Sequence, residues 1–214
     1  MSGLREKNKE QRRQRIRRAT LDILREKGFD QATTREIAER AGVAKGTLFL
    51  YAADKLDLCL MCINDDLDHL TDVAFDNVDS ALPLLDQLVA FFEPRYEFWE
   101  RHPELSRIAT REMSTAYAPA DRSREYSRGI ARREHTYRNL SELLRRGSSK
   151  KNRATADIEC LARIIHDIYL AELRFWLSSD RPCAREGLAT LRTFVAPVLS
   201  LILPKSQGGR RSSP

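Results

Sequence analysis

The stretch from Thr33 to Lys55, TTREIAERAGVAKGTLFLYAADK, constrains the fold of this chain more than any other segment. Thr33 and Glu36 have the spacing of a capping box, in which each side chain accepts a backbone N–H at a helix N-terminus. Gly42 can adopt the left-handed conformation that ends a helix. The apolar residues around it are spaced so that a second short helix folds back on the first. This pattern predicts a helix-turn-helix, although an ordinary pair of antiparallel helices has a similar pattern.

The positive charge of the chain is concentrated around this stretch. The 214 residues carry a formal net charge of +6. Residues 1–55 contain 14 Lys and Arg against 8 Asp and Glu, whereas residues 56–214 contain 23 of each kind. Because neutralisation of phosphates by Lys and Arg supplies most non-specific DNA affinity, the asymmetry favours a nucleic-acid surface in the first quarter of the chain.

Composition and periodicity divide the chain into four segments. Residues 1–11 are polar and predict a flexible basic arm, which either only aids solubility or contacts the minor groove or phosphates of DNA. Residues 12–57 predict a three-helix domain that contains the helix-turn-helix, and residues 58–204 predict a larger helical domain. Residues 205–214 are rich in Gly and Ser and predict a disordered tail. The expected fold is therefore all-α, with about nine helices in total.

Several classes of protein are disfavoured by what the sequence lacks. It has no apolar run of about 18 residues and no apolar segment after the charges of its N-terminus, so we expect a cytoplasmic protein without a membrane span. It has no glycine-rich phosphate loop, no G-x-S-x-G and no paired-histidine metal motif. The four histidines are scattered along the chain. We therefore expect neither an enzyme nor a cofactor.

The helix expected over residues 54–78 carries an acidic run from Asp65 to Asp79. Asp65, His69 and Asp72 are spaced to share one helix face, and carboxylates are the ligands that hard cations prefer. A solvated acidic face is the simpler interpretation and the one we favour.

The same helix contains Cys59 and Cys62 in a C-x-x-C spacing. A zinc site needs four ligands, and no second pair lies nearby. A redox switch is the other alternative, but two cysteines three residues apart on a straight helix are not placed for a disulfide. We favour buried structural cysteines, because free cysteine is usually buried.

Residues 37–58, IAERAGVAKGTLFLYAADKLDL, resemble the DNA-binding domain of the TetR family of transcriptional regulators. The resemblance covers residues 12 to about 58 and includes the preceding helix, the Gly28-Phe29 stop and the Thr33-Thr34 pair. It implies that the protein binds double-stranded DNA through a recognition helix. The residues expected to contact DNA are Thr34, Arg35, Lys45, Gly46, Thr47, Phe49, Leu50, Tyr51 and Lys55.

Five of these residues have specific expected roles. Lys45 supplies charge, Thr47 offers a hydroxyl to a phosphate or base, and Leu50 offers an apolar contact such as a thymine methyl. Tyr51 and Lys55 are expected to position the DNA backbone.

Three positions depart from the usual pattern of the family. Ala44 stands where a capping residue is frequent, Phe49 replaces a frequent Tyr, and Ala52 replaces a frequent Phe. The change at position 49 removes a hydroxyl that could contact a phosphate, and Ala52 reduces the core volume beneath the next helix.

The second domain is expected, from the resemblance, to bind a small-molecule effector between its helices. Aromatic residues at helical spacing are also typical of an ordinary core. The candidate lining residues are Phe92, Tyr96, Trp99, Met113, Tyr117, Tyr137, His166 and Tyr169.

The last two expected helices carry apolar residues at alternating spacings of three and four, which predicts a seam for another helix. The resemblance implies that these helices pair with their copies across a two-fold axis in a four-helix bundle. A core within one chain is the alternative. The expected interface residues are Leu161, Ile165, Ile168, Trp176, Leu188, Leu191, Val195, Val198 and Ile202.

These observations favour a homodimeric repressor that an unknown small molecule releases from a palindromic operator. The alternative is a DNA-binding protein without such an effector, controlled by a protein partner or acting architecturally.

Overall fold

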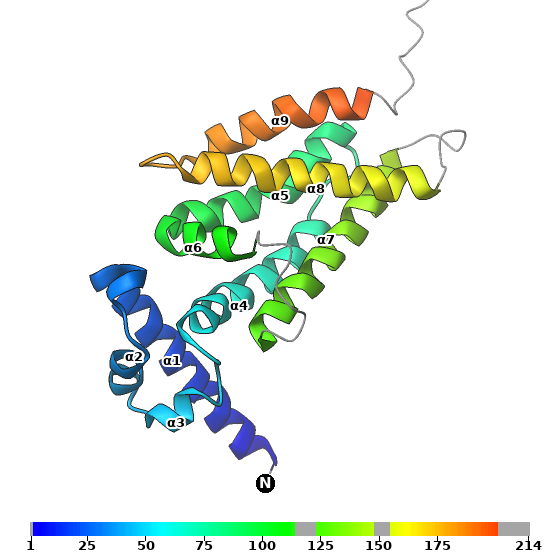
Figure 1. Ribbon diagram of the computed structural model, residues 1–214. Helices are drawn as coiled ribbons and strands as arrows, with labels where there is room; N and C mark the ends of the chain where they lie inside the picture. Colours follow the sequence, from blue (N-terminus) through cyan, green and yellow to red (C-terminus); the bar gives the residue numbers. More distant parts are fainter. Residues whose placement is uncertain (1, 114–122, 148–154, 201–214) are drawn as a thin grey trace, which may run out of the picture. The chain divides into compact units, whose positions relative to one another are not determined.

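In a computed structural model, residues 2–113, 123–147 and 155–200 can be described, and their regular secondary structure is entirely helical (Figure 1). The prediction of an all-α fold with nine helices is confirmed for these residues. The helices are α1 (Ser2–Gln31), α2 (Thr34–Ala41), α3 (Lys45–Leu48), α4 (Lys55–Asp76), α5 (Leu84–Arg101), α6 (Pro103–Met113), α7 (Arg124–Gly147), α8 (Thr155–Leu177) and α9 (Ala184–Ser200).

The chain forms two compact units, and their boundary does not follow the one expected at residues 57 and 58. The first unit combines Met1–Val73 with Phe98–Glu134, and the second combines Ala74–Glu97 with His135–Pro214. Most of α4 belongs to the first unit because its buried residues, such as Leu58 and Ile63, extend the core of the N-terminal helices. The expected tail at residues 205–214 lies outside the described residues.

In the first unit, α1, α2 and α3 share a small apolar core. Ile16, Ile37 and Leu48 are fully enclosed, one from each helix. Ala52, where the family often has Phe, is also buried. Burial of a large aliphatic side chain contributes roughly 1.5–3 kcal/mol, so these residues hold the short helices on α1.

The flexible arm expected at residues 1–11 is wrong for residues 2–11, which form the first turns of α1. The segment contains no proline, and its single glycine stands near the start. Side chains one helical turn apart also interact, because Lys9 lies 3.6 Å from Glu6 and the Gln14 amide donates to Glu10 at 2.7 Å. The same charges that predicted an arm therefore support a helix.

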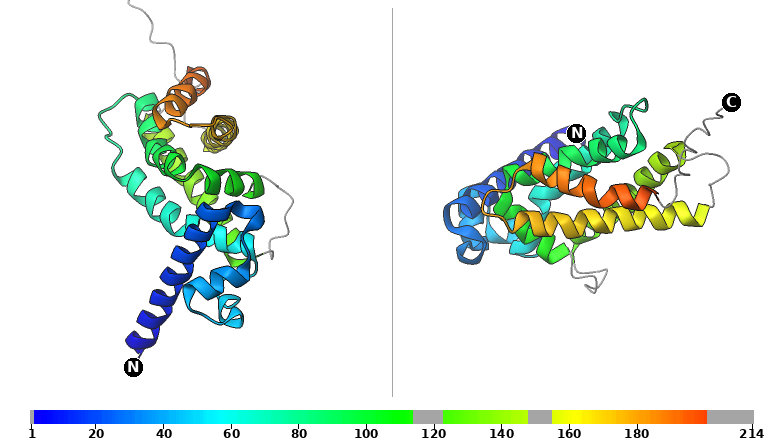
Figure 2. Two further views of the ribbon diagram at one scale, coloured as in Figure 1. Left: turned by 90° about the vertical axis from the view of Figure 1, so that its left-hand side faces the viewer. Right: turned by 90° about the horizontal axis from the view of Figure 1, so that it is seen from above.

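In the second unit, α8 and α9 run antiparallel and side by side, as both the side view and the view from above show (Figure 2). Buried aromatic residues of α5, among them Phe91, Phe92 and Tyr96, pack into the same unit. Gly187 of α9 permits a close approach: a Cβ atom there would lie 2.5 Å from Cε1 of Tyr96. A larger residue at position 187 would push α9 away from α5.

Candidate functional site

The capping box predicted at the start of α2 is confirmed. The Thr33 hydroxyl accepts the N–H of Glu36 at 3.2 Å, and the Glu36 carboxylate accepts the N–H of Thr33 at 3.1 Å. Lys27 forms an ion pair with the same carboxylate, which joins α2 to the end of α1. The start of α2 is therefore fixed by local chemistry that the sequence already displays.

The turn between α2 and α3 is also formed as predicted. Gly42 has φ 63° and ψ 44°, in the left-handed region, and its N–H donates to carbonyls at the end of α2. The next N–H, from Val43, donates to the Ala38 carbonyl at 3.0 Å. A guanidinium nitrogen of Arg15 lies 3.5 Å from where a Cβ on Gly42 would stand. Only glycine adopts this backbone conformation at little cost, so α3 leaves α2 at a defined angle.

The predicted recognition segment presents apolar residues to solvent. Leu50 is 82% exposed and Phe49 is 44% exposed, whereas Leu48, the last residue of α3, is fully buried. Lys45 and Gly46 are exposed, and Thr47 is half-buried. Regular helix covers only Lys45–Leu48, and Ala44 at its N-cap provides no side-chain hydrogen bond. An exposed leucine in the turn directly after a short, fixed helix suits insertion into a groove.

Two expected phosphate contacts have partners inside the protein. The Tyr51 hydroxyl donates to the Lys9 carbonyl at 3.4 Å. The Lys55 ammonium donates to the Phe29 carbonyl and, at 3.3 Å, to that of Asp30, and it lies 4.4 Å from the centroid of the Phe29 ring. Lys55 therefore caps the carboxyl end of α1. Its contact with a DNA phosphate stays a prediction.

The two expected DNA contacts on α2 differ in exposure. Thr34 is half-buried at the first position of the helix, and Arg35 is exposed. The Arg35 guanidinium donates to Glu39 at 2.9 Å, one turn further along. Exposed pairs of this kind are weak, so Arg35 can exchange its partner for a phosphate at little cost.

The first part of the acidic face of α4, from Asp65 to Asp68, is paired with arginines and is not arranged for a metal. Arg13 of α1 holds Asp65 with two hydrogen bonds, Nη2–Oδ1 at 2.7 Å and Nε–Oδ2 at 3.1 Å. Arg17 of α1 pairs with Asp66 on the same face. Within the described residues no group of three His, Cys, Asp or Glu side chains could hold a metal ion. The favoured interpretation of Asp65–Asp68 as a solvated face is therefore wrong.

Residues from the start of α7 complete this cluster. Arg128 donates to Asp65 at 2.9 Å, to Glu125 at 2.8 Å and to Asp68 at 2.6 Å. Glu125 is 1% exposed and also accepts the Asn64 amide at 2.9 Å. A further arginine, Arg132, donates to Asp68 at 2.7 Å. The cluster thus joins α1, α4 and α7 through alternating charges, an arrangement that stabilises only while every member keeps its partner.

Burial alone would raise the pKa of Asp65, but hydrogen bonds from Arg13 and Arg128 outweigh it and hold that pKa below its usual value. Burial likewise opposes protonation of Arg128, yet its bonds to Asp65 and Asp68 raise its pKa. Both shifts favour the ionised forms. The cluster is therefore a network of charges at neutral pH.

The two cysteines of α4 are buried thiols, which confirms the structural interpretation. Burial raises the pKa of Cys59 to about 12 and raises that of Cys62 as well. A thiol with a raised pKa is seldom a thiolate at neutral pH and reacts slowly. Neither residue has the environment of a redox sensor.

Five of the eight candidate effector residues gather inside the second unit. The rings of Phe92 and Tyr169 stack at 4.5 Å, Tyr96 meets Tyr169 edge to face at 5.8 Å, and Tyr137 meets His166 at 4.9 Å. His166 and Tyr169 are neighbours on α8, with centroids 5.8 Å apart. This aromatic cluster links α5, α7 and α8.

The other three candidates do not join the aromatic cluster. Trp99 lies in the first unit, where its ring packs 5.0 Å from that of Phe98. The side chain of Met113 and all of Tyr117 lie outside what the structure describes.

Buried polar atoms without a hydrogen-bond partner among the described residues include one on α5 and one on α7, both in the second unit. These two are the hydroxyl of Tyr96, which is fully buried, and the side-chain nitrogen of Asn139, which is 7% exposed. Such atoms are rare in native proteins because leaving a buried donor unsatisfied costs roughly 1–3 kcal/mol. Sequence reasoning missed Asn139, since an asparagine inside an amphipathic helix has no distinguishing pattern.

Most of the predicted dimer residues pack inside the chain. Five of them have side chains that are at least nine-tenths buried: Leu161, Ile165, Leu188, Leu191 and Val195. Ile168, Trp176 and Val198 are half-buried, and Ile202 lies outside the described residues. The large apolar side chains that α8 and α9 do expose are Ile164 at 42%, Phe175 at 77% and Phe194 at 50%. The three-four seam thus forms the intrachain core, the alternative left open by the sequence.

The geometry defines a helical protein with a fixed helix-turn-helix in one unit and an aromatic interior in the other. No helix among the described residues is both long and apolar enough to cross a bilayer. The sequence model for bacterial regulatory proteins of the tetR family matches residues 16–61. This match identifies residues 16–61 as a DNA-binding domain of the kind found in bacterial regulatory proteins of the tetR family.

Similar proteins include repressors from two mycobacterial genera. The HTH-type transcriptional repressor KstR of Mycolicibacterium smegmatis is 28% identical over 169 residues, which cover 78% of this chain and 78% of that protein. KstR of Mycobacterium tuberculosis is 28% identical over 171 residues, covering 78% and 72% respectively.

Solved structures share the fold at lower identity. Thermus thermophilus FadR, a TetR-family repressor in complex with lauroyl-CoA, superimposes with a TM-score of 0.66 at 22% identity, covering 92% of this chain and 98% of that one. Bacillus subtilis FadR in complex with stearoyl-CoA gives a TM-score of 0.64 at 16% identity, covering 87% and 96%.

Proposed function

We propose that this chain is a cytoplasmic, homodimeric transcriptional repressor that an acyl thioester of coenzyme A releases from a palindromic operator. One observation carries the DNA-binding part: Leu50 and Phe49 are exposed on a segment whose angle is fixed by the Gly42 turn. KstR, the relative matched over most of the chain, is a repressor, which supports the same direction of control.

The recognition segment fits a division of labour between bases and backbone. Leu50 is the more exposed of the two large apolar residues and suits a thymine methyl, while Lys45 and Thr47 offer a charge and a hydroxyl nearby in the chain. Thr34, Arg35, Gly46, Tyr51 and Lys55 stay the candidates for backbone contacts. A dimer would place two such segments about 34–36 Å apart, which requires a palindromic site with half-sites one helical turn apart.

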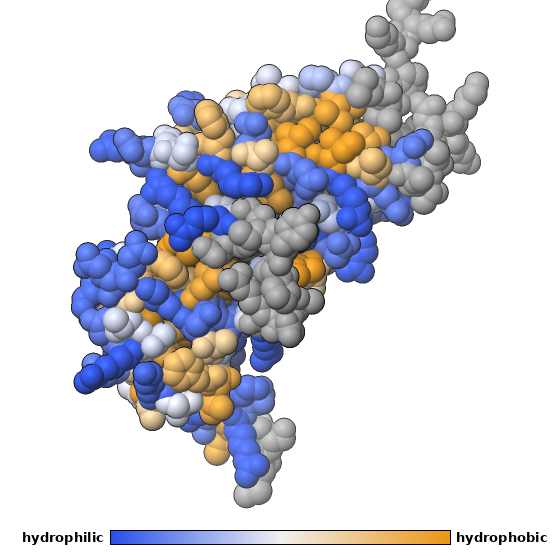
Figure 3. All heavy atoms as spheres, in the orientation of Figure 1, coloured by the Kyte–Doolittle hydropathy of each residue, from blue (hydrophilic) through white to orange (hydrophobic). Residues whose placement is uncertain are grey.

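The exposed aromatic residues of α8 and α9 support a dimer through these helices. Phe175 and Phe194 are more exposed than a monomer favours for residues of this size. Figure 3 shows apolar side chains gathered over α8 and α9 on the face in view. The interface we propose therefore uses the outer faces of the helices, and the seam expected from the sequence stays inside.

The interior of the second unit supports a ligand with an apolar body and a polar acceptor. The aromatic cluster supplies flat apolar surface. The Tyr96 hydroxyl and the Asn139 amide nitrogen can both donate hydrogen bonds, so a carbonyl oxygen suits either of them. An acyl thioester combines a hydrocarbon chain with a carbonyl, and two FadR proteins of the same fold have been solved with such ligands.

Release of DNA follows only if the effector binds the two conformations of the dimer with different affinities. The test begins with a duplex that the protein selects from a random-sequence pool. Lauroyl-CoA and stearoyl-CoA are then titrated into the complex, with free coenzyme A as the control, and release is followed by fluorescence anisotropy. Release by the acyl thioesters alone supports the proposal. Sequence-specific binding that no acyl thioester weakens would refute the effector and leave control by a protein partner.

Tyr96→Phe separates a binding role of the hydroxyl from a structural one. If the hydroxyl donates to the effector, the variant should bind lauroyl-CoA roughly two- to tenfold more weakly, the equivalent of one neutral hydrogen bond. Removing an unsatisfied buried hydroxyl should not destabilise the protein, so thermal unfolding should be unchanged or occur at a higher temperature. Unchanged lauroyl-CoA affinity would exclude Tyr96 from the effector site.

A further inference from the structure

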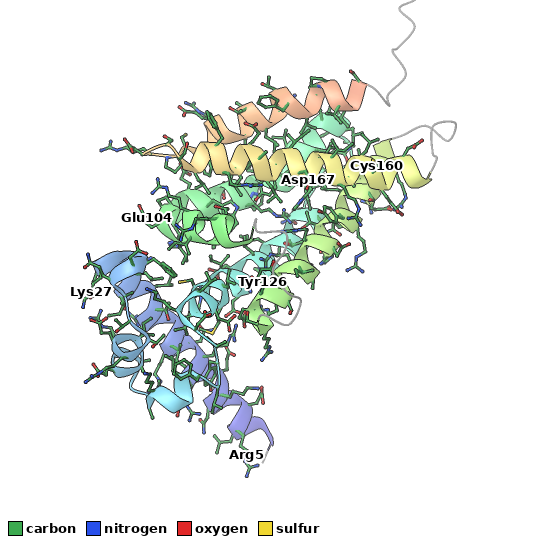
Figure 4. The ribbon with its side chains drawn as sticks, viewed as in Figure 1. Arg5, Lys27, Glu104, Tyr126, Cys160 and Asp167 are labelled. Carbon is green, nitrogen blue, oxygen red and sulfur yellow. The ribbon has the colours of Figure 1, made fainter. Side chains whose placement is uncertain are left out.

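The first half of α1 carries a row of positive charge, most of which has no carboxylate partner among the described residues. Arg5, Lys7, Lys9 and Arg15 are exposed and Arg12 is half-buried. Only two acidic residues, Glu6 and Glu10, lie in the same stretch. Among the described residues, Arg5, Lys7, Arg12 and Arg15 form no salt bridge. The Arg5 side chain projects from the end of the helix into solvent (Figure 4).

This charged row lies beside the recognition segment, in the same compact unit. The Tyr51 hydroxyl meets the Lys9 backbone at 3.4 Å, and Arg15 reaches the Gly42 turn. A crevice of about 640 Å³ lies between these elements, and its lining includes Lys9, Arg12, Leu50 and Tyr51. The residue most suited to touch a base, Leu50, therefore borders a crevice with basic walls.

The first residue of α7, Arg124, also lines this crevice. It is exposed and has no carboxylate partner among the described residues. The other charged residues of the lining have both signs: Arg13 and Arg128 are positive, and Glu6, Glu10 and Asp65 are negative. Asp65 is already neutralised by Arg13 and Arg128, and Glu10 accepts the Gln14 amide. The lining holds five basic side chains against three acidic ones, so its net charge is positive. Lys9 lies 3.6 Å from Glu6, whereas Arg12 and Arg124 have no carboxylate partner among the described residues.

We propose that a backbone phosphate of the bound DNA enters this crevice and is held by Lys9, Arg12 and Arg124. The proposal rests on the DNA-binding function proposed above and extends the DNA contact surface from the helix-turn-helix to α1 and α7. The helical form of residues 2–11 decides the type of contact. A helix with side chains is about 10–12 Å across and the minor groove about 6 Å wide, so this segment lies along the phosphates outside the groove.

A phosphate contact differs from a base contact in its salt dependence and in its indifference to sequence. The logarithm of the binding constant falls with the logarithm of salt concentration by about 0.9 for each phosphate contacted. A dimer carries every substitution twice, so loss of one contact per subunit should reduce the slope by about 1.8. The loss should be of similar size on a specific and on an unrelated duplex.

The experiment uses the full-length protein with Arg12→Gln, Arg124→Gln and the double variant. Arg185→Gln, which removes one exposed charge from α9 in the other unit, is the matched control. Arg12→Lys keeps the charge and should restore most of the wild-type slope. Binding is measured between about 50 and 200 mM salt on a duplex selected by the wild-type protein and on a scrambled duplex of equal length.

We expect the double variant to lower the slope by about 1.8 on both duplexes and each single glutamine variant by part of that amount, while Arg185→Gln leaves it unchanged. Wild-type slopes in Arg12→Gln and Arg124→Gln would overturn the proposed contact, and so would a loss confined to the selected duplex. A wild-type protein that binds neither duplex would instead refute the proposed function itself. Thermal unfolding of each variant shows whether a changed slope reflects an intact fold.

Discussion

Asp65→Asn tests whether the charged cluster of α1, α4 and α7 stabilises the first unit. The substitution keeps the shape of the side chain but removes the charge that accepts two bonds from Arg13 and one from Arg128. Breaking a fully buried ion pair costs about 3–5 kcal/mol. The Asp65 side chain is 23% exposed, so we expect the smaller loss of about 2–3 kcal/mol in the free energy of unfolding.

The assay is urea unfolding followed by circular dichroism, with wild type and variant compared at each pH. At neutral pH the loss should correspond to a fall of roughly 5–10 °C in melting temperature for a chain of this size. Asp76→Asn, at an exposed position of the same helix, is the control and should change stability little.

Acidification supplies the decisive comparison. The pKa of Asp65 in the folded protein lies below its usual value of 3.8, so its carboxylate stabilises the fold above about pH 4. That contribution is lost as the pH falls through the folded-state pKa, because the wild-type carboxyl group then becomes neutral like the amide. The stability difference between wild type and Asp65→Asn should therefore shrink below about pH 4. A difference that stays constant from neutral pH to pH 3 would refute an electrostatic role and point to packing.

Two further predictions concern the second unit. Gly187→Ala should destabilise the protein by about 1–3 kcal/mol in urea unfolding, because the new methyl would lie 2.5 Å from the Tyr96 ring. The same loss should appear in a Tyr96→Phe background, since the ring edge and not the hydroxyl makes the contact, and an unchanged midpoint would contradict it. Phe194→Glu should convert the dimer to monomers in light scattering, whereas Arg185→Glu on the same helix should not. A dimeric Phe194→Glu protein would place the interface elsewhere.

The helix-turn-helix could be predicted from the sequence because its determinants are local. The bonds between Thr33 and Glu36 join residues three apart, and the Gly42 conformation depends on the chain immediately around it. Leu48 folds back after a turn of a few residues, so its burial also follows from spacing. Interactions between residues one or two helical turns apart leave few alternative structures for such a segment.

The charged cluster could not be predicted in the same way. Arg13 and Asp65 are 52 residues apart, and Asp65 and Arg128 are 63 apart. Read within its own helix, the aspartate run has no positive neighbour, so it resembles a solvated face. Only the packing of α1 and α7 against α4 supplies the arginines.

The seam on α9 shows a second limit of sequence pattern. The spacing of Leu188, Leu191 and Val195 indicates that a helix packs there but does not say whether that helix belongs to the same chain. In this protein α8 of the same chain packs against α9, and the exposed Phe194 lies beside the seam. The helical pattern thus predicts a packed seam without identifying the helix that covers it.

Burial of that seam inside one chain also sets the order of folding and assembly for the proposed dimer. Each subunit encloses Leu191 and Val195 without a second copy, so its core is complete before it meets a partner. Dimers of pre-folded subunits joined by a modest apolar patch can dissociate and exchange. Two variants produced in one cell would then form mixed dimers, and a subunit with an altered recognition segment could direct its partner to an asymmetric operator.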